Sequence, residues 1–285
     1  MFRALSSPRI AFAKCLKYST LKVSKAGDHI LKVSINRTSK MNAMNLSFFH
    51  ELKSCFNDAT NDASTRAIVL MAEGENFSSG IDIGDLKKIM MANEGESDAA
   101  VISKSLRSSI SDLQSCFSAV FNCTKPVIAA VQGLCMGAGV DLVLAADVRL
   151  CEKNTSFSIK EVDLGISADL GTLQLLPRAI GSESLCRELI LTARTMNANE
   201  AKQCGFVSKE LPDIQSLHEN ALEIADTIAS KSPIAVQGSK YILNYSRDHS
   251  LKESMAHQAL WNSVMLQGKD TSIAVKAALM KKTPV

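Results

Sequence analysis

The sequence predicts an α/β fold in which buried strands alternate with amphipathic helices, followed by a helical C-terminal module. Two apolar runs, AIVLMA at 67–72 and VIAAV at 127–131, have the length and composition of buried strands. Each run is followed by a glycine-containing loop and then by a helical pattern. A chain of 285 residues, 46% of them hydrophobic, can bury the core of one sizeable domain.

The alternation begins with HILKVSINR, in which Leu31, Val33 and Ile35 are separated by polar residues. This period of two predicts a half-buried strand. Residues 46–62 follow with apolar side chains every three or four positions, which predicts an amphipathic helix. Asn45 is placed to cap that helix.

The remaining elements are predicted from helical spacing and from continuous apolar runs. In order, they are a strand at 66–74, a loop at 77–86, a helix and a mobile connection at 87–104, a long helix at 103–123, a strand at 126–133, a buried helix at 140–147 and a strand at 148–154. From Gly171 the pattern is almost wholly helical, with breaks at 177–181 and 204–213. We therefore expect a core domain at 26–213 and a helical module at 214–285.

The first 27 residues differ from the rest of the chain in charge. They contain six Lys or Arg residues and no acid, so the formal net charge of +3 becomes −3 without them. They are rich in Ser and allow an amphipathic helix, as is typical of mitochondrial transit peptides. We expect a transit-like segment at 1–25, and a disordered basic tail is the alternative. No apolar run approaches the roughly 20 residues that a membrane-spanning helix needs.

The cysteines and histidines do not form a recognisable metal or disulfide pattern. Eight cysteines are scattered without a CxxC pair, and five histidines form no HExxH motif. The cysteines therefore resemble small buried hydrophobic residues in a reducing compartment. We expect no metal site.

Two loops combine small residues with a position between a buried strand and a helix: FSSGID at 77–82 and QGLCMGAGVDL at 132–142. Backbone N–H groups at a helix start have no intrahelical partner, so they can bind a carbonyl oxygen. Two such loops in one domain can form an oxyanion hole for a thioester oxygen. The second loop lacks the GxGxxG order of dinucleotide-binding loops and is not a Walker A loop, and the chain has no GxSxG elbow.

These loops occur in order with NRTSKMNAMN, KEVDLGISADLGTLQ and a late CGFVSKELP. Together the motifs resemble those of the crotonase superfamily of enoyl-CoA hydratases and isomerases, from about residue 25 to the C-terminus. The resemblance implies a crotonase-type spiral of ββα turns and an enzyme that acts on acyl-CoA thioesters. It implies no separate cofactor, because coenzyme A is part of the substrate.

Within this superfamily the carboxylates decide the reaction. A hydratase-like member would carry acids at the positions of Asp141 and Glu161. Hydratases usually have a small residue where this chain has Asp169, and EVDLGISADLGTLQ resembles the Δ3,5-Δ2,4-dienoyl-CoA isomerase branch. The resemblance therefore implies isomerisation of 3,5-dienoyl-CoA to 2,4-dienoyl-CoA in fatty-acid β-oxidation.

In that reaction one proton leaves C2 and another is added at C6. Glu161 and Asp169 are the implied base and acid, with Glu161 near C2 and Asp169 near C6, or the reverse. Asp141 is expected to tune or orient them. Apolar neighbours should desolvate these acids and raise their pKa values. The backbone N–H groups of Ile81 and Ala138 would hold the dienolate oxygen.

The resemblance also implies where the substrate binds. Lys40 could meet a phosphate of coenzyme A. This sequence departs from the usual pattern at Thr38, where Pro is common, at Met41, where a basic residue is common, and at Ala138, where Gly is usual. The other implied contacts are Ser79, Gly80, Ile81, Asp82 and Ile83, together with Ala138.

The acids also have a purely structural interpretation. Acids that precede a helix such as 172–180 are often N-caps, and Glu161 and Asp169 both precede it. Asp163 is interpreted as a helix or turn partner. The two small-residue loops and the spacing of the acids favour catalysis for Glu161 and Asp169.

Other functions remain as alternatives. Enoyl-CoA hydration and Δ3-Δ2 isomerisation use the same scaffold, and Asp169 argues against hydration. Some crotonase-like proteins bind RNA, but a charge of −3 without the basic segment and the absence of a basic, aromatic stripe argue against that. Retention of three acids argues against an inactive assembly protein.

Superfamily members assemble as trimers or dimers of trimers, which implies a homotrimer or homohexamer here. Apolar stripes at 233–247 and 250–266, with Trp261, could serve this assembly or pack within the chain. The C-terminus reads KKTPV and does not resemble the peroxisomal SKL signal. The implied location is the mitochondrial matrix.

Overall fold

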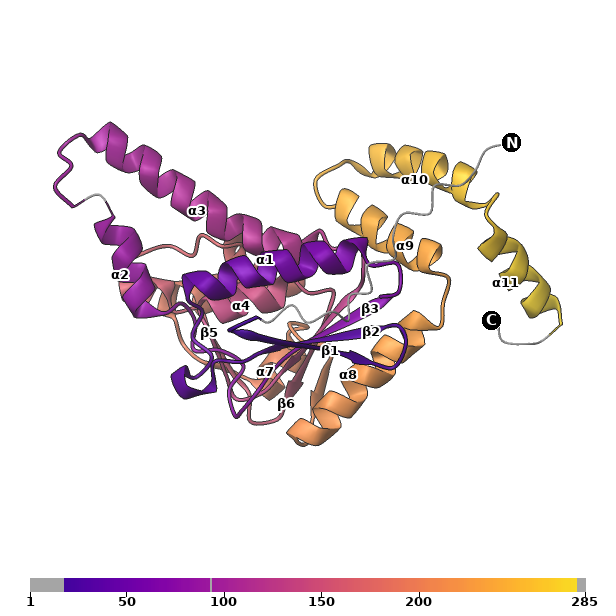
Figure 1. Ribbon diagram of the computed structural model, residues 1–285, viewed down its shortest axis with the longest axis horizontal. Helices are drawn as coiled ribbons and strands as arrows, with labels where there is room; N and C mark the ends of the chain where they lie inside the picture. The colour runs from indigo at the N-terminus through magenta and orange to yellow at the C-terminus, as the bar shows by residue number, and fades with distance from the viewer. Residues whose placement is uncertain (1–17, 93, 281–285) are drawn as a thin grey trace.

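The computed structural model describes residues 18–92 and 94–280, which form two sheets surrounded by helices (Figure 1). The larger sheet has six strands in the order β1-β2-β3-β4-β6-β9. The first pair is antiparallel and every later pair is parallel. The strands are β1 (Leu21–Ala26), β2 (Ile30–Ile35), β3 (Ala67–Ala72), β4 (Val127–Val131), β6 (Val148–Glu152) and β9 (Lys209–Leu211).

Helices cover both faces of this sheet, which explains why its central strands are apolar throughout. In β3, Ile68 and Leu70 pack into the cluster formed with α1 (Leu46–Asn61), α3 (Ala99–Phe121) and α4 (Ala138–Leu144). The alternating Val69 and Met71 pack on the opposite face against α8 (Ile214–Ala229). Figure 1 shows α1, α3 and α4 on one side of the sheet and α8 on the other. Both side-chain sets of a central strand are therefore buried, as expected for parallel sheets.

The cap and the apolar spacing predicted for α1 are confirmed. The side chain of Asn45 accepts a hydrogen bond of 2.9 Å from the N–H of Phe48, which caps the helix. Phe48, Leu52 and Phe56 lie on one face at helical spacing and are completely buried. The strands predicted at 66–74, 126–133 and 148–154 are also present, as β3, β4 and β6.

A smaller sheet, β5-β7-β8, lies beside the segment that carries the acids. Its strands are β5 (Leu134–Met136), β7 (Ser156–Ser158) and β8 (Met196–Asn197). The remaining elements of the core are 3-10 turns η1 (Thr38–Lys40) and η2 (Glu161–Leu164) and helices α2 (Ile83–Met91), α5 (Thr172–Ala179), α6 (Glu183–Thr192) and α7 (Ala198–Gln203).

Three helices stand to one side of this core: α9 (Pro233–Tyr245), α10 (Leu251–Met265) and α11 (Lys269–Leu279) (Figure 1). An ion pair whose lysine is buried attaches α9 to the core. Lys240 donates to Asp147 Oδ2 at 2.7 Å and to the carbonyl of Lys125 at 3.1 Å, and its side chain is 7% exposed. The helix α8, which the sequence assigned to the C-terminal module, packs instead on the main sheet.

Several short elements differ from the sequence-based expectation. Strand β1 overlaps the stretch that was assigned to the transit-like segment, and β5, β7, β8 and β9 were not predicted. These last four strands have two or three residues each, too few to show a period of two. Helix α3 begins at Ala99 rather than Ser103. Helix α5 continues through Pro177 to Ala179, so the break predicted at 177–181 begins only at Ile180.

The transit-like segment at 1–25 lies mostly outside the described residues, since the structure begins at Tyr18. Strand β1 pairs with β2 along its whole length. A leader would therefore have to end before Leu21 if the sheet is to keep this strand. No helix among the described residues is long and apolar enough to cross a membrane.

Candidate active site

Backbone pairing holds the two glycine-containing loops side by side. Ser78 donates its N–H to the carbonyl of Leu134 at 2.9 Å, and Met136 donates to the carbonyl of Ser78 at 3.0 Å. A Cβ added to Gly80 would lie 3.0 Å from the carbonyl oxygen of Met136 and 3.8 Å from the nitrogen of Ala138. Position 80 therefore requires glycine, both for this contact and for its φ of 94°.

This pairing leaves two backbone N–H groups free where the loops meet. The neighbours of Ile81 are engaged, because Met44 donates to the carbonyl of Gly80 and Asp82 donates to that of Met44. Ala138 is the first residue of α4, where N–H groups have no intrahelical partner. Within the described part of the chain, neither Ile81 nor Ala138 donates its N–H to a protein acceptor. The structure thus brings together the two donors predicted for an oxyanion hole.

Gly137 shapes the second loop. Its φ of 49° and ψ of −121° are closed to residues with a side chain. Its N–H donates to the carbonyl of Ser158 at 2.9 Å. A Cβ at this position would lie 3.4 Å from Glu161 Oε1, so the carboxylate of Glu161 lies next to the loop that presents Ala138.

Asp141 lies in α4, three residues after Ala138, and is 1% exposed. Its Oδ1 accepts a hydrogen bond of 2.6 Å from the N–H of Thr172, whereas its buried Oδ2 has no partner among the described residues. Burial raises the pKa of Asp141 to about 7, and the charges of Glu161 and Asp169 also raise it. This carboxyl is therefore held close to its midpoint of ionisation at neutral pH.

Glu161 is the first residue of η2 and is partly buried. Its Oε2 is buried without a hydrogen-bond partner among the described residues. Burial raises the pKa of Glu161, and the charge of Asp169 adds to this effect. An unpaired carboxylate oxygen in an apolar setting is available to accept a proton.

Asp169 follows η2 in an irregular loop that α3 supports. Gln114 of α3 donates from Nε2 to the main-chain carbonyl of Asp169 at 2.6 Å, and the adjacent Ala168 is buried. Burial raises the pKa of the half-buried Asp169 carboxyl. The three acids come from a helix, a 3-10 turn and a loop, and their mutual effects on pKa show that they lie within electrostatic range.

The capping interpretation of these acids does not match the structure. The N-cap of α5 is Gly171, which offers no side chain. The N–H of Thr172 is satisfied instead by Asp141, from α4. Neither Glu161 nor Asp169 caps α5, so their carboxylates are free for another role.

A cavity of about 520 Å³ borders Glu161 between η2, α5 and α6. Its lining is largely apolar, and Glu183 and Arg187 of α6 also line it. Such a cavity suits an apolar group next to an ionisable one. The apolar residues that line it are Ile159, Val162, Ala168, Leu173, Pro177, Ile190 and Leu191.

The other predicted binding residues surround the first loop. Asp82 is already engaged, because it caps α2 through Gly84 and pairs with Arg37 at 3.2 Å. Lys40 lies exposed in η1, and Ile83 is 60% exposed. Asp163 pairs with Lys160 at 3.0 Å, in agreement with its structural interpretation. The sequence did not predict three residues that bind the site residues: Arg37, Gln114 and Thr172. No local pattern marks them, because each lies at least 31 positions from its partner in the chain.

The fold and the paired loops define a coenzyme A thioester enzyme of the crotonase type. The model of the enoyl-CoA hydratase/isomerase family matches residues 25–280, and the chain belongs to this family. A crystal structure of enoyl-CoA hydratase from Bacillus anthracis superposes with a TM-score of 0.82 at 31% identity, covering 93% of this chain and 98% of that one.

Two curated relatives carry a more specific name. The Mus musculus protein named Delta(3,5)-Delta(2,4)-dienoyl-CoA isomerase, mitochondrial, is 47% identical over 93% of this chain and 81% of its own length. The Arabidopsis thaliana protein with the same enzyme name, described as peroxisomal, is 40% identical over 94% of this chain and 96% of its own length. The fold class and the family expected from the sequence are therefore confirmed.

Proposed function

We propose that this chain is a Δ3,5-Δ2,4-dienoyl-CoA isomerase of fatty-acid β-oxidation. The observation that carries the proposal is the third acid, Asp169, grouped with Asp141 and Glu161 beside two free backbone donors. The relatives named as this isomerase, at 40% and 47% identity, support the same reaction.

The reaction needs two proton transfers at distant carbons. When a base removes a proton from C2 of a 3,5-dienoyl thioester, the electrons delocalise over the thioester oxygen, C2, C4 and C6. Addition of a proton at C6 then leaves double bonds at C2 and C4, and the overall formula is unchanged. One carboxylate cannot easily reach both carbons, which explains why two acids are needed.

The backbone N–H groups of Ile81 and Ala138 hold the thioester oxygen while it carries negative charge. Hydrogen-bond donors that are fixed before the reaction stabilise such charge, and removal of one donor typically costs about 10²–10³ in kcat. Ala138 is suited to this role because a backbone donor does not depend on its side chain.

Glu161 acts at C2 and Asp169 at C6 in this proposal. The carboxylate of Glu161 lies next to Gly137, the residue before the Ala138 donor. Since C2 is bonded to the thioester carbon, the acid beside the oxyanion donor is the one that reaches C2. Asp169 then supplies the proton at C6, and its raised pKa favours the protonated form that this step requires.

Asp141 supports the other two acids without transferring a proton. Its Oδ1 fixes the start of α5 through Thr172, close to the Asp169 loop. Its partly protonated carboxyl limits the negative charge near Glu161. Coenzyme A is part of the substrate, and no separate cofactor takes part. Its contacts are proposed at Ser79–Ile83 and Lys40.

The direct test is an ultraviolet assay of the purified protein with 3,5-octadienoyl-CoA, which follows the conjugated 2,4-dienoyl product. Wild type should form the product, and Glu161→Gln and Asp169→Asn should each lose at least about 100-fold in kcat, within the range of general acid–base catalysis. Asp112→Asn is the control, because this carboxylate on α3 is exposed.

Two results would reject the proposal. One is an unaffected Asp169→Asn variant, which would make Asp169 structural. The other is a wild-type protein that only hydrates 2-enoyl-CoA, which would favour a hydratase using Asp141 and Glu161. A filter-binding assay with a salt titration tests the RNA-binding alternative. An RNA-binding protein is expected to retain RNA on the filter in a salt-dependent manner.

We propose in addition that α9–α11 bury an apolar surface against further copies of this chain, as a homotrimer or homohexamer. Several of their large apolar side chains are exposed, including Leu243 at 67%, Leu251 at 81% and Leu260 at 66%. Light scattering should report an oligomer for wild type and a smaller species for Leu260→Lys. Leu191→Lys, at an equally exposed position of α6, should leave the mass unchanged.

The proposed location is the mitochondrial matrix. The basic, acid-free N-terminal segment and the mitochondrial name of the mouse relative support it, while the Arabidopsis relative is named as peroxisomal. The full chain with a fluorescent tag at its C-terminus should coincide with a matrix marker. Coincidence with a peroxisomal marker would contradict this location.

A further inference from the structure

The carbonyl of Ala193 holds the segment that leads into Glu161. It accepts one hydrogen bond from Ser158 Oγ at 2.7 Å and another from Lys160 Nζ at 3.1 Å. Ser158 and Ala193 are 3% and 1% exposed. We call these three residues, Ser158, Lys160 and Ala193, the 193 clamp. It holds the chain at two points immediately before Glu161.

The same segment is bonded to the oxyanion loop. The carbonyl of Ser158 accepts the N–H of Gly137 at 2.9 Å, and Ser158 pairs with Met136 where β5 and β7 meet. Gly137 directly precedes Ala138. Ser158 therefore has two contacts: its main chain binds the loop that presents an oxyanion donor, and its side chain donates to the carbonyl of Ala193.

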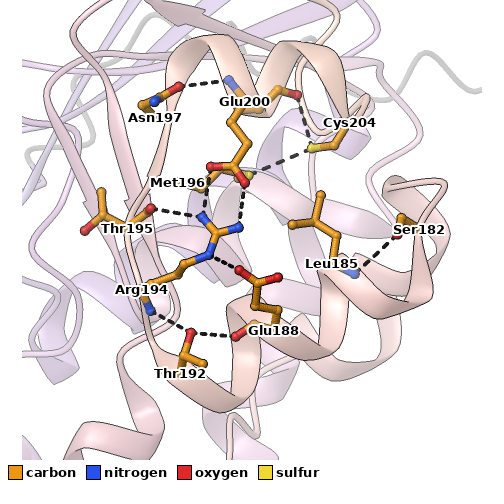
Figure 2. Close-up of polar contacts among 11 residues, drawn as sticks. Ser182, Leu185, Glu188, Thr192, Arg194, Thr195, Met196, Asn197, Glu200 and Cys204 are labelled. Atoms are coloured by element: carbon orange, nitrogen blue, oxygen red, sulfur yellow. Dashed lines mark hydrogen bonds and ion pairs between the residues drawn. The ribbon is translucent and has the colours of Figure 1, made fainter.

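Ala193 is itself held by a network of charges. It ends α6 in the left-handed conformation, with a φ of 51°. The next residue, Arg194, donates from Nε to Glu188 of α6 at 2.6 Å and from two nitrogens to Glu200 of α7 at 2.6 and 2.9 Å. Figure 2 shows the guanidinium between the two carboxylates. A bidentate pair fixes orientation as well as distance, so the turn that carries Ala193 is anchored to both helices.

Glu161 depends on this anchoring because its own carboxylate is not fully held. Its Oε2 has no hydrogen-bond partner among the described residues, although it is buried. The position of the carboxylate is then determined by the main chain from which it projects. The segment that precedes it is fixed both by the 193 clamp and by the hydrogen bond from Gly137 to Ser158.

We propose that Ser158 and Lys160 are positioning residues, which set the carboxylate of Glu161 relative to the Ala138 N–H through the carbonyl of Ala193. The inference rests on the proposed function, in which Glu161 exchanges a proton with the substrate. Ser158 and Lys160 do not exchange protons with it. Their effect is on the alignment of the base with C2 while the thioester oxygen is bound.

The expected effect follows from the sensitivity of proton transfer to alignment. A displacement of about 1 Å can cost on the order of 100-fold in rate. Ser158→Ala should therefore lower kcat by roughly 10–100-fold. KM should change by less than about 2-fold, because the proposed coenzyme A contacts, Ser79–Ile83 and Lys40, lie outside the segment that Ser158 holds, and lost transition-state alignment appears in kcat.

Thr155→Val is the matched control. Thr155 is 1% exposed and donates from its hydroxyl to the carbonyl of Val131 at 3.0 Å, just before β7 begins. Each variant thus deletes one buried hydroxyl–carbonyl hydrogen bond, at opposite ends of the same strand. Both should lower the urea midpoint to a similar extent, whereas only Ser158→Ala should lower kcat.

The kinetic isotope effect with substrate deuterated at C2 distinguishes positioning from general destabilisation. If proton removal is slowed, the isotope effect on kcat should rise in Ser158→Ala and stay at the wild-type value in Thr155→Val. Lys160→Met should also lower kcat, as Ser158→Ala does. Lys160→Arg keeps a charged donor and should retain most of the wild-type kcat. Lys160 is partly exposed, so its variants should fold even if Ser158→Ala does not.

The inference is overturned if Ser158→Ala and Thr155→Val have the same kcat and isotope effect. If Ser158→Ala does not fold, an unchanged kcat in Lys160→Met overturns it. These outcomes leave the proposed function intact, provided that wild type forms the 2,4-dienoyl product. If wild type forms none, the proposed function fails, and the same variants are compared in hydration of 2-enoyl-CoA, where Glu161 would also transfer a proton.

Discussion

Replacing Asp141 with Asn should make the stability of the protein less dependent on pH. The side chain is 1% exposed, and burial raises its pKa to about 7 from an ordinary value of 3.8. Asn has the same shape, and its carbonyl oxygen can still accept the N–H of Thr172. Its NH₂ group takes the place of the unpaired Oδ2, where a protonated Asp141 also carries a donor. The substitution therefore mainly removes ionisation.

The direction in which stability changes with pH depends on whether the folded or the unfolded protein keeps the proton of Asp141. Below about pH 4 Asp141 is protonated in both states, so its ionisation contributes nothing. Between about pH 4 and 7 the unfolded chain releases a proton that the folded chain keeps, so wild type loses stability as pH rises. One pH unit corresponds to 1.36 kcal/mol, so a pKa of about 7 in place of 3.8 gives a loss of roughly 4 kcal/mol above pH 7.

Urea unfolding of wild type and Asp141→Asn across the pH range measures this difference. The advantage of the variant should grow by about 2 kcal/mol between pH 5.5 and 8.5, since part of the loss is already present at the lower pH. Asp112→Asn, which replaces an exposed carboxylate on α3, is the control and should show no such growth. A difference between wild type and Asp141→Asn that stays constant with pH would refute the reasoning.

Four further predictions follow from particular contacts. The pH profile of kcat/KM should be bell-shaped, with an acid limb above the ordinary glutamate pKa, because the base must be ionised while the acid is protonated and burial raises both pKa values. Gly137→Ala should cost about 1–3 kcal/mol in stability and most of the activity, because its φ and ψ exclude a side chain. Lys240→Met should cost about 1.5 kcal/mol, because it removes the charged hydrogen bond to Asp147, whose carboxylate keeps its hydrogen bond from the N–H of Val127. Asn45→Ala should cost about 1 kcal/mol through loss of the α1 cap.

Each of these predictions has a measurement that can contradict it. A pH profile with a single limb near pH 4 would show that the base is not desolvated. For the glycine, Gly181→Ala is the control, since a Cβ there meets open space, and equal unfolding midpoints would contradict the strain argument. Urea unfolding tests the other two variants. Wild-type stability for Lys240→Met would mean that α9 docks without the ion pair, and an unchanged Asn45→Ala would mean that the cap contributes nothing.

The sequence by itself was sufficient for the elements whose residues repeat over a long stretch. Strand β2 and helix α1 follow from their periodicity, because the spacing of apolar residues records which faces are buried. Strand β3 follows from the length and composition of its continuous apolar run. The cap at Asn45 also follows, since it involves residues three positions apart. The motifs of the two loops and of residues 160–174 were likewise sufficient to place the chain in its family.

The tertiary structure decided what depends on residues that are distant in the chain. Strands β5 and β8 have three and two residues, and they exist because β7 lies between them. Asp141, rather than Glu161 or Asp169, binds the N–H of Thr172, a partner 31 residues away. The attachment of Glu161 through Ala193 spans a similar distance. Local periodicity specifies which face of an element is apolar, but only packing brings together polar groups from separate elements and fixes which of them are left unpaired.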